Sequence, residues 1–310
     1  MKKLKIGTCS WKYDSWKGII YPTDGEFNYL EEYSKHFNTV EIDQWFWSLF
    51  DKDKTRLPIP MDVTEYSQSV PAKFQFTIKI PNSVTLTHFY KKSKSESLIV
   101  NENFLSKKLF DTILNKLDPM KEKIGVLMFQ FEYLNKQKMS SQIEFQDKFS
   151  SFISKCSDEF NYGIEIRNPN YLNQSYFDFI QENNLAHVFL QGYYMPDIFD
   201  LFTKFEKSIS KRCVIRLHGP DRKGIEERSG SVWNKRIEPK ESELENVVKM
   251  IQKLQPACLP ACLSDIDVAG RSDIDVAGRS KKVDLFVNVN NHYEGSAPLT
   301  IRRIHELMEK

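Results

Sequence analysis

Short apolar runs rich in β-branched and aromatic residues recur along the chain, and longer amphipathic stretches separate them. The runs predict strands at residues 4–9, 39–43, 74–80, 124–130, 162–167, 186–190, 212–218 and 283–289. Helices are predicted between most of them, for example at 28–37, 103–117, 142–156, 175–183 and 241–255. Alternation of strand and helix implies parallel strands joined by right-handed crossovers.

This order of elements favours the α/β class and a closed (β/α)8 barrel of the TIM type. An open doubly wound sheet, the alternative, usually carries a glycine-rich phosphate turn after an early strand, whereas this chain has 12 glycines and no such turn. Its 310 residues suit one barrel, since such barrels run to about 250 residues and tolerate insertions. We therefore expect a single domain over residues 1–310.

One segment interrupts the pattern of strands and helices. Residues 256–280 read PACL-PACL and then SDIDVAGR-SDIDVAGR, which are two tandem duplications. Repeat architectures need more and longer units, so the duplication predicts an inserted, disordered surface loop before the last strand. We assign this loop no function.

Polar side chains gather where five predicted strands end. Each pair is spaced i, i+2, so both members point to one face of the strand. In a TIM barrel this end of the strands carries the catalytic site. The pairs are Glu41 and Asp43, Thr77 and Lys79, Glu165 and Arg167, Arg216 and His218, and Asn288 and Asn290.

The types of these residues suggest acid–base chemistry on an anion. Glu41, Glu165 and His218 are the candidate catalytic residues, because carboxylates and imidazole can transfer protons near neutral pH. The candidate substrate-binding residues include cations that suit a phosphate or carboxylate and amides that could orient a hydroxyl. They are Lys79, His88, Arg167, Arg216, Asn290 and Asn291. The alternative is an internal ion network, in which Glu165–Arg167 and Glu41–Lys79 pairs only close the barrel top.

The tryptophans also follow predicted strands. Trp11 and Trp45 come directly after theirs, so we expect them to stack on a ring of the ligand. For Trp16, Trp47 and Trp233, packing within loops is an equally good interpretation.

Composition narrows the classes of partner and compartment. Lys and Arg number 44 against 42 Asp and Glu, a net charge of +2 that gives no argument for a nucleic-acid coat. No apolar run approaches the roughly 18 residues of a membrane span, and the N-terminus lacks the apolar core of a secretory signal. The five cysteines are widely spaced and odd in number, which is typical of free thiols in a reducing compartment. We expect a cytoplasmic protein with no membrane partner.

The histidines give little support for a metal. The chain has six, with no HxH or HExxH pattern, and we predict no cofactor and no metal ligands. A single divalent ion held by Glu41, Glu165 and His218 is the alternative.

Several stretches together resemble the YecE-like proteins, domain-of-unknown-function family 72. They occur in family order and fall on different predicted strands, and the resemblance covers nearly the whole chain. The stretches are IGTCSWKYDSWKG…YP (6–22), LEEYSKHFNTVEI (30–42), FQFTIKIPNSVTLTH (74–88), NYGIEIRNPNY (161–171), VIRLHG (214–219) and FVNVNNHYEGSAP (286–298). The resemblance implies a TIM-type barrel. The chain departs from the family after VEI, where Asp43 of DQWFWSLF replaces an asparagine.

Three functions follow as hypotheses. The first is a hydrolase or isomerase that acts on a phosphorylated or nucleotide-like anion by carboxylate and histidine acid–base chemistry at the C-terminal face of the barrel. The second is a nucleic-acid-binding or processing factor, in which the tryptophans and arginines grip a base. The third is a barrel that binds a small ligand without catalysis.

Overall fold

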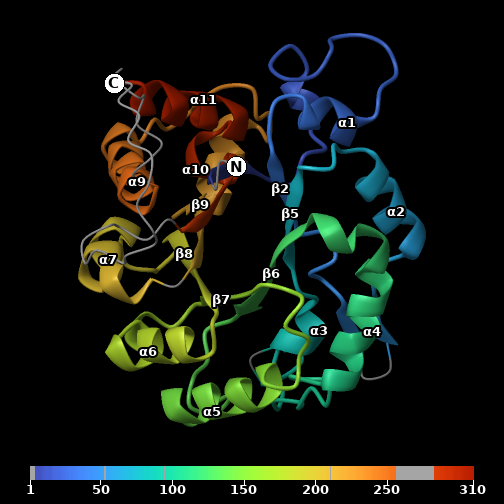
Figure 1. Cartoon of the computed structure of the whole chain (residues 1–310), viewed down its shortest axis with the longest axis vertical. Coiled ribbons are helices and arrows are strands. Elements are labelled where there is room, and N and C mark those ends of the chain that lie inside the picture. The colour runs from blue at the N-terminus through green and yellow to red at the C-terminus, as the bar shows by residue number, and fades with distance from the viewer. Residues whose placement is uncertain (1–3, 52–53, 92, 94, 210, 256–282) are drawn as a thin grey trace, which may run out of the picture.

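The predicted barrel is confirmed by the computed structural model, which describes residues 4–51, 54–91, 93, 95–209, 211–255 and 283–310. Parallel strands close on themselves in the order β1-β10-β9-β8-β7-β6-β5-β2 (Figure 1). The strands are β1 (Leu4–Cys9), β2 (Thr39–Ile42), β5 (Gln75–Lys79), β6 (Ile124–Phe131), β7 (Tyr162–Ile166), β8 (Ala186–Gly192), β9 (Arg212–Gly219) and β10 (Asp284–Val289). A short antiparallel pair, β3 (Leu49–Asp51) and β4 (Lys54–Thr55), follows β2 outside the barrel.

Helices surround the barrel on all sides (Figure 1). The outer ones are α1 (Tyr29–Ser34), α2 (Pro60–Gln68), α4 (Lys107–Leu117), α5 (Gln142–Ile153), α6 (Gln174–Glu182), α7 (Ile198–Phe205), α9 (Glu241–Leu254) and α11 (Ala297–Met308). Three further helices, α3 (Asn82–Thr85), α8 (Arg222–Ser229) and α10 (Asn291–Glu294), follow closely on the ends of β5, β9 and β10. Turns of 3-10 helix occur at η1 (Asp14–Trp16), η2 (Asp118–Lys123), η3 (Pro169–Tyr171) and η4 (Glu206–Ser208).

Capping side chains set where several helices begin. The helix predicted from residue 103 begins at Lys107, because the Ser106 side chain accepts a hydrogen bond from the Leu109 N–H. Ser141 caps α5 in the same way through the Glu144 N–H, which agrees with the predicted start at 142. Caps are local sequence signals, so the true start of α4 at Lys107 was visible in the sequence.

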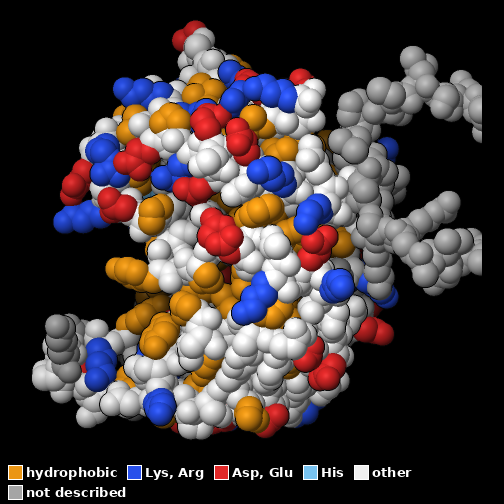
Figure 2. Space-filling model, turned by 90° about the vertical axis from the view of Figure 1, so that its left-hand side faces the viewer, with side chains coloured by type: hydrophobic (Ala, Val, Ile, Leu, Met, Phe, Trp, Pro, Cys, Tyr) orange, Lys and Arg blue, Asp and Glu red, His pale blue; other side chains and the backbone are white. Residues whose placement is uncertain are grey.

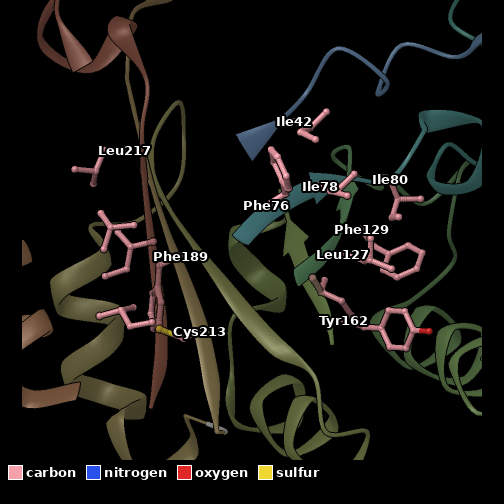
Figure 3. Close-up of a cluster of buried hydrophobic side chains, with 14 of the residues drawn as sticks. Ile42, Phe76, Ile78, Ile80, Leu127, Phe129, Tyr162, Phe189, Cys213 and Leu217 are labelled. Carbon is pink, nitrogen blue, oxygen red and sulfur yellow. The ribbon is translucent and has the colours of Figure 1, made fainter. Parts of the chain in front are cut away.

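The two faces of the strands bury different kinds of side chain. Outward-facing residues such as Ile42, Ile78 and Leu217 pack beneath the helices (Figure 3). Phe129 of β6 lies with its ring centroid 5.3 Å from that of Phe110 on α4 and 5.3 Å from that of Phe149 on α5. A separate apolar cluster fills the interior of the barrel, and it consists of Val126, Met128, Ala186, Val188, Val214 and Phe286.

Above that interior cluster the inward-facing residues are polar. Asn288 pairs in register with Arg216, two positions beyond the pairing of Phe286 with Val214. The barrel therefore has an apolar floor and a polar upper layer at the C-terminal ends of its strands, where the sequence predicts the site.

Two further predictions concern the duplicated segment and membrane spans. The duplicated segment 256–280 lies outside the described residues. Among the helices of the described ranges, none is long and apolar enough to cross a membrane.

Candidate functional site

Arg216 lies at the centre of the polar layer, between two carboxylates from other strands. Its Nε is 2.7 Å from Oε2 of Glu41 and its Nη2 is 2.6 Å from Oε1, which makes a bidentate pair. Its Nη1 donates to Oε2 of Glu165. All three side chains are buried. Burial disfavours the charge of Arg216, but the two carboxylates outweigh it and raise the pKa of Arg216 well above its ordinary value.

Further polar groups complete the hydrogen bonding of these carboxylates. Arg167 donates from Nε to Oε1 of Glu165 at 3.0 Å. Asn288 donates from Nδ2 to Oε2 of Glu41 at 3.3 Å and to Oγ1 of Thr77 at 2.9 Å. Burial raises the pKa of Glu165, yet the charges of Arg216, Arg167 and Lys79 prevail and lower it to about 2.

This arrangement changes the interpretation of the predicted ion network. The expected Glu165–Arg167 pair is present, but the partner of Glu41 is Arg216 and not Lys79. The prediction failed because strand spacing does not report partners across the interior: β1 and β10 separate β2 from β9, and the long side chain of Arg216 reaches Glu41 through the barrel interior. Both oxygens of Glu41 are occupied by Arg216, so Glu41 and Glu165 have the geometry of positioning residues.

A cavity of about 730 Å³ opens above this network. Its charged and polar lining includes Lys79, Arg167, Arg222, Asp43, Glu132, Gln130, His218, Asn290 and His292. Its aromatic lining is Tyr13, Phe46, Trp47, Tyr90, Tyr133, Tyr193 and Tyr194. Figure 2 shows exposed hydrophobic side chains gathered near the left-hand margin of the molecule, around an indentation of the surface.

His218 links the cavity to the buried layer. Its Nε2 lies 3.6 Å from Sγ of Cys9, and its Nδ1 lies 3.4 Å from the hydroxyl of Tyr193. Burial, followed by the charges of Arg216, Lys79 and Arg167, lowers the pKa of His218 well below its ordinary value. The imidazole is therefore neutral at physiological pH and can donate from one nitrogen while it accepts at the other.

Lys79 and Asp43 reach the cavity from neighbouring strands. Ile42 pairs in register with Ile78, so Asp43 and Lys79 come next to each other along β2 and β5. Burial, followed by the charge of Arg216, lowers the pKa of Lys79. Burial, followed by the charge of Glu41, raises the pKa of Asp43. Each shift favours the neutral form of its group.

Five of the predicted binding residues lie outside the cavity lining, and one of them, Arg216, belongs to the buried network beneath it. Trp45 stacks on Tyr66 with the ring centroids 5.8 Å apart, and Trp11 packs edge-on against the same ring at 5.0 Å. The turn in which the Phe46 N–H bonds to the carbonyl of Asp43 brings Phe46 over the cavity and leaves Trp45 beside Tyr66. The stacking of Trp11 and Trp45 on a ligand ring therefore stays a prediction, and Trp47 is the tryptophan that lines this cavity.

The two remaining predicted binding residues outside the cavity lining are His88 and Asn291. His88 lies in an irregular strand bridge with Val100, and its Nδ1 is 2.9 Å from Oγ1 of Thr87. Asn291 is buried and accepts from the Ala297 N–H at 2.9 Å, which ties α10 to the start of α11. Asn290 does line the cavity, and its side chain also caps α10 through the His292 N–H.

Sequence reasoning missed most of the aromatic lining. Tyr13, Tyr133 and Tyr193 each follow a barrel strand within a few residues, which is the same signal that was applied to tryptophan. Tyr193 has φ +56°, a left-handed backbone that tyrosine rarely adopts, and its ring lies 4.8 Å from the guanidinium carbon of Arg167. Arg222, the first residue of α8, was also missed.

The donor atoms fit a metal ion poorly. Among the described residues, Cys9, Glu41 and His218 bring one ligand atom each within 4.8 Å of one another, and Glu165 is not in this group. Arg216 already holds both oxygens of Glu41, and its charge would repel a cation. Burial, followed by the charge of Glu41, also raises the pKa of Cys9 well above its ordinary value, which opposes formation of a thiolate ligand.

A family model described as "Protein of unknown function DUF72" matches residues 5–310. The chain belongs to the DUF72 family. The curated UPF0759 protein YecE of Escherichia coli strain K12 is 23% identical to this DUF72 chain over 169 residues. That alignment covers 54% of this chain and 50% of YecE, so the chain spans about half the length of the curated relative it matches.

Solved structures of two DUF72 family proteins share the barrel. One, from Enterococcus faecalis V583, has a TM-score of 0.63 at 16% identity and covers 99% of this chain and 96% of its own. The other, from Thermotoga maritima MSB8, has a TM-score of 0.60 at 15% identity and covers 99% of each chain. These similarities establish the fold of the DUF72 chain, and its function has to be argued from the cavity.

Proposed function

We propose that this DUF72 protein is an enzyme, a hydrolase or isomerase, that acts on a small anionic ligand of phosphorylated or nucleotide-like type. The observation that carries the proposal is the composition of one cavity. Lys79, Arg167 and Arg222 line it together with His218 and Asp43, so cations and proton-transfer groups face the same space. Arginine binds a phosphate or carboxylate bidentately, and the aromatic walls suit a ring.

The acid–base roles move from the buried glutamates to the cavity lining. Asp43 is the proposed base, because it faces the cavity and its raised pKa brings proton uptake closer to neutral pH. Neutral His218 is the proposed hydrogen-bond donor to a developing oxyanion. Glu41 and Glu165 hold Arg216, which in turn fixes the charge beneath Lys79 and His218.

Matched pairs of ligands test the proposal by thermal shift. AMP and ribose 5-phosphate are expected to stabilise the protein, and adenosine and ribose are expected to have much smaller effects. A ligand at about 100 times its Kd contributes about 2.7 kcal/mol of stability. Arg167→Gln should abolish the difference within each pair, whereas Arg303→Gln on the outer helix α11 should retain it. Equal stabilisation by charged and neutral members would contradict the proposal.

Turnover separates an enzyme from a barrel that only binds. Once a stabilising ligand is found, Asp43→Asn should bind it and fail to convert it. Binding without conversion by the unmodified protein, followed over hours, would favour the non-catalytic barrel.

A nucleic-acid role is the second candidate, and exposed aromatic residues favour it. Trp47, Tyr90, Tyr133 and Tyr194 line the cavity and are all more than half exposed, so they could stack on unpaired bases. This role predicts strongly salt-dependent binding of a short single-stranded oligonucleotide. Absence of binding at low salt would exclude it.

We also propose a cytoplasmic location. Cys9, Cys156 and Cys213 are free thiols among the described residues, as suits a reducing compartment. Cell fractionation with a compartment marker tests this, and recovery with periplasmic or membrane markers would contradict it.

A further inference from the structure

We infer that Lys79 forms an imine with a carbonyl group of the ligand, so that the ligand is a small anion that also carries an aldehyde or ketone. The inference rests on the proposed anion-binding function and narrows its substrate class. Three features of the described residues support it: the position of the amine, the pairing of the surrounding charges and the presence of proton-transfer groups.

The amine of Lys79 lies at the cavity and not in an ion pair. The side chain ends β5, is 9% exposed and lines the cavity. Its Nζ is 4.0 Å from the centroid of the Phe46 ring. Within the described ranges, no carboxylate oxygen makes a salt bridge with this Nζ, whereas Arg167 pairs with Glu165 and Arg216 pairs with both Glu41 and Glu165. An amine in such a position is accessible to a bound electrophile.

The pairing of Arg216 explains why, among the described residues, no carboxylate makes a salt bridge with Lys79. Arg216 takes both oxygens of Glu41 and one oxygen of Glu165, and Arg167 takes the other oxygen of Glu165. Lys79 is thus next to a permanent positive charge in a buried position. Both conditions lower the pKa of Lys79 and favour the neutral amine, which is the nucleophilic form.

Groups able to move the required protons line the same cavity. The neutral Nζ of Lys79 attacks the carbonyl carbon, the C=O π electrons pass to oxygen, and oxygen gains a proton while nitrogen loses one to give a carbinolamine. The hydroxyl then takes a second proton and leaves as water as the nitrogen lone pair forms the C=N bond. The product is a protonated imine, which can release its remaining N–H proton. No oxidant or reductant is needed. Asp43 can carry these protons, and neutral His218 can donate to the oxygen as it develops charge.

The imine would extend the chemistry of the cavity. A protonated imine draws electrons from the adjacent carbon, which makes a proton there easier to remove. Isomerisation of a phosphorylated sugar uses such a step, so Lys79 would supply the electron sink and Asp43 the base. Arg167 and Arg222 are left to hold the anionic group.

Reductive trapping tests the inference. The full-length protein is treated with glyceraldehyde 3-phosphate and sodium borohydride, and adducts are located by peptide mass spectrometry. Lys79 is expected to be modified about tenfold faster than the exposed Lys155, because binding holds the aldehyde beside its amine. Lys79→Arg should lose the fast phase, and Lys155→Arg should keep it. Lys79→Met serves as a second variant if Lys79→Arg fails to fold.

The outcomes distinguish this inference from the proposed function. Trapping at Lys79 no faster than at Lys155 would overturn the imine, and phosphate-dependent thermal stabilisation in the same samples would leave the anion site intact. Loss of that stabilisation as well would overturn both. Trapping at Lys79 that is equally fast with unphosphorylated glyceraldehyde would keep the reactive amine but reject an anionic substrate.

Discussion

Arg216 of β9 donates hydrogen bonds to both carboxylate oxygens of Glu41 on β2 through the interior of the barrel. The Nε–Oε2 distance is 2.7 Å and the Nη2–Oε1 distance is 2.6 Å. The two residues are 1% and 0% exposed, so water cannot replace either partner. A buried pair costs much more to break than to replace as a whole.

Removing Arg216 should therefore destabilise the protein severely. Arg216→Met leaves two buried carboxylates without their cation, and we expect a loss of about 3–5 kcal/mol in the free energy of unfolding, measured with urea. Lys223→Met is the matched control. Its partner Glu227 is 3.8 Å away and both side chains are exposed, so a change within about 1 kcal/mol is expected. Similar losses in the two variants would contradict the burial argument.

The free energy of unfolding should fall in acid as Glu165 becomes protonated. Its folded pKa of about 2 lies below the ordinary value of 4.5, so the unfolded chain binds the proton more readily. The stabilisation is complete above about pH 4.5 and is lost as the pH falls towards 2. Glu165→Gln should be less stable than the parent at pH 6, with a difference that shrinks at low pH. A stability difference between Glu165→Gln and the parent that does not change with pH would contradict the lowered pKa of Glu165.

Lys79 should reduce stability at neutral pH. Its folded pKa is lowered, so below the ordinary value of 10.5 the unfolded chain gains a proton that the folded chain resists, and stability falls. Lys79→Met should raise the free energy of unfolding at pH 7. The gain should vanish above about pH 11, where both states are neutral. A destabilised Lys79→Met at pH 7 would show that the ammonium form contributes structurally.

His218 should not titrate in the ordinary range. Burial and the charges of Arg216 and Arg167 keep it neutral, so its ring proton NMR signals should not show the transition near pH 6.5 that an unperturbed imidazole gives. The unfolded chain gains this proton below pH 6.5, so His218 lowers stability as the pH falls below that value. His218→Gln should lack this loss. A midpoint near 6.5 for His218 would contradict the neutral donor role.

Much of the fold was predictable because its signals are local. The ends of every barrel strand lie within two residues of the predicted ends. The prediction succeeded because runs of β-branched residues between amphipathic segments are typical of buried strands. The i, i+2 spacing also correctly indicated that Lys79, Arg167 and His218 face one end of the barrel. Asp43 was visible in the sequence as a departure from the family pattern, although not as a candidate base.

The sequence by itself determined the barrel, the end that carries the cavity and the residue types gathered there. Tertiary structure alone decided which charges pair: barrel closure turns Arg216 of β9 and Glu41 of β2 into the same interior, where they pair, and Lys79 is left at the cavity. It also decided that Trp11 and Trp45 pack on Tyr66 while tyrosines line the cavity. Periodicity fixes the face of a strand on which a side chain lies, but contacts between distant strands and loops depend on closure in three dimensions.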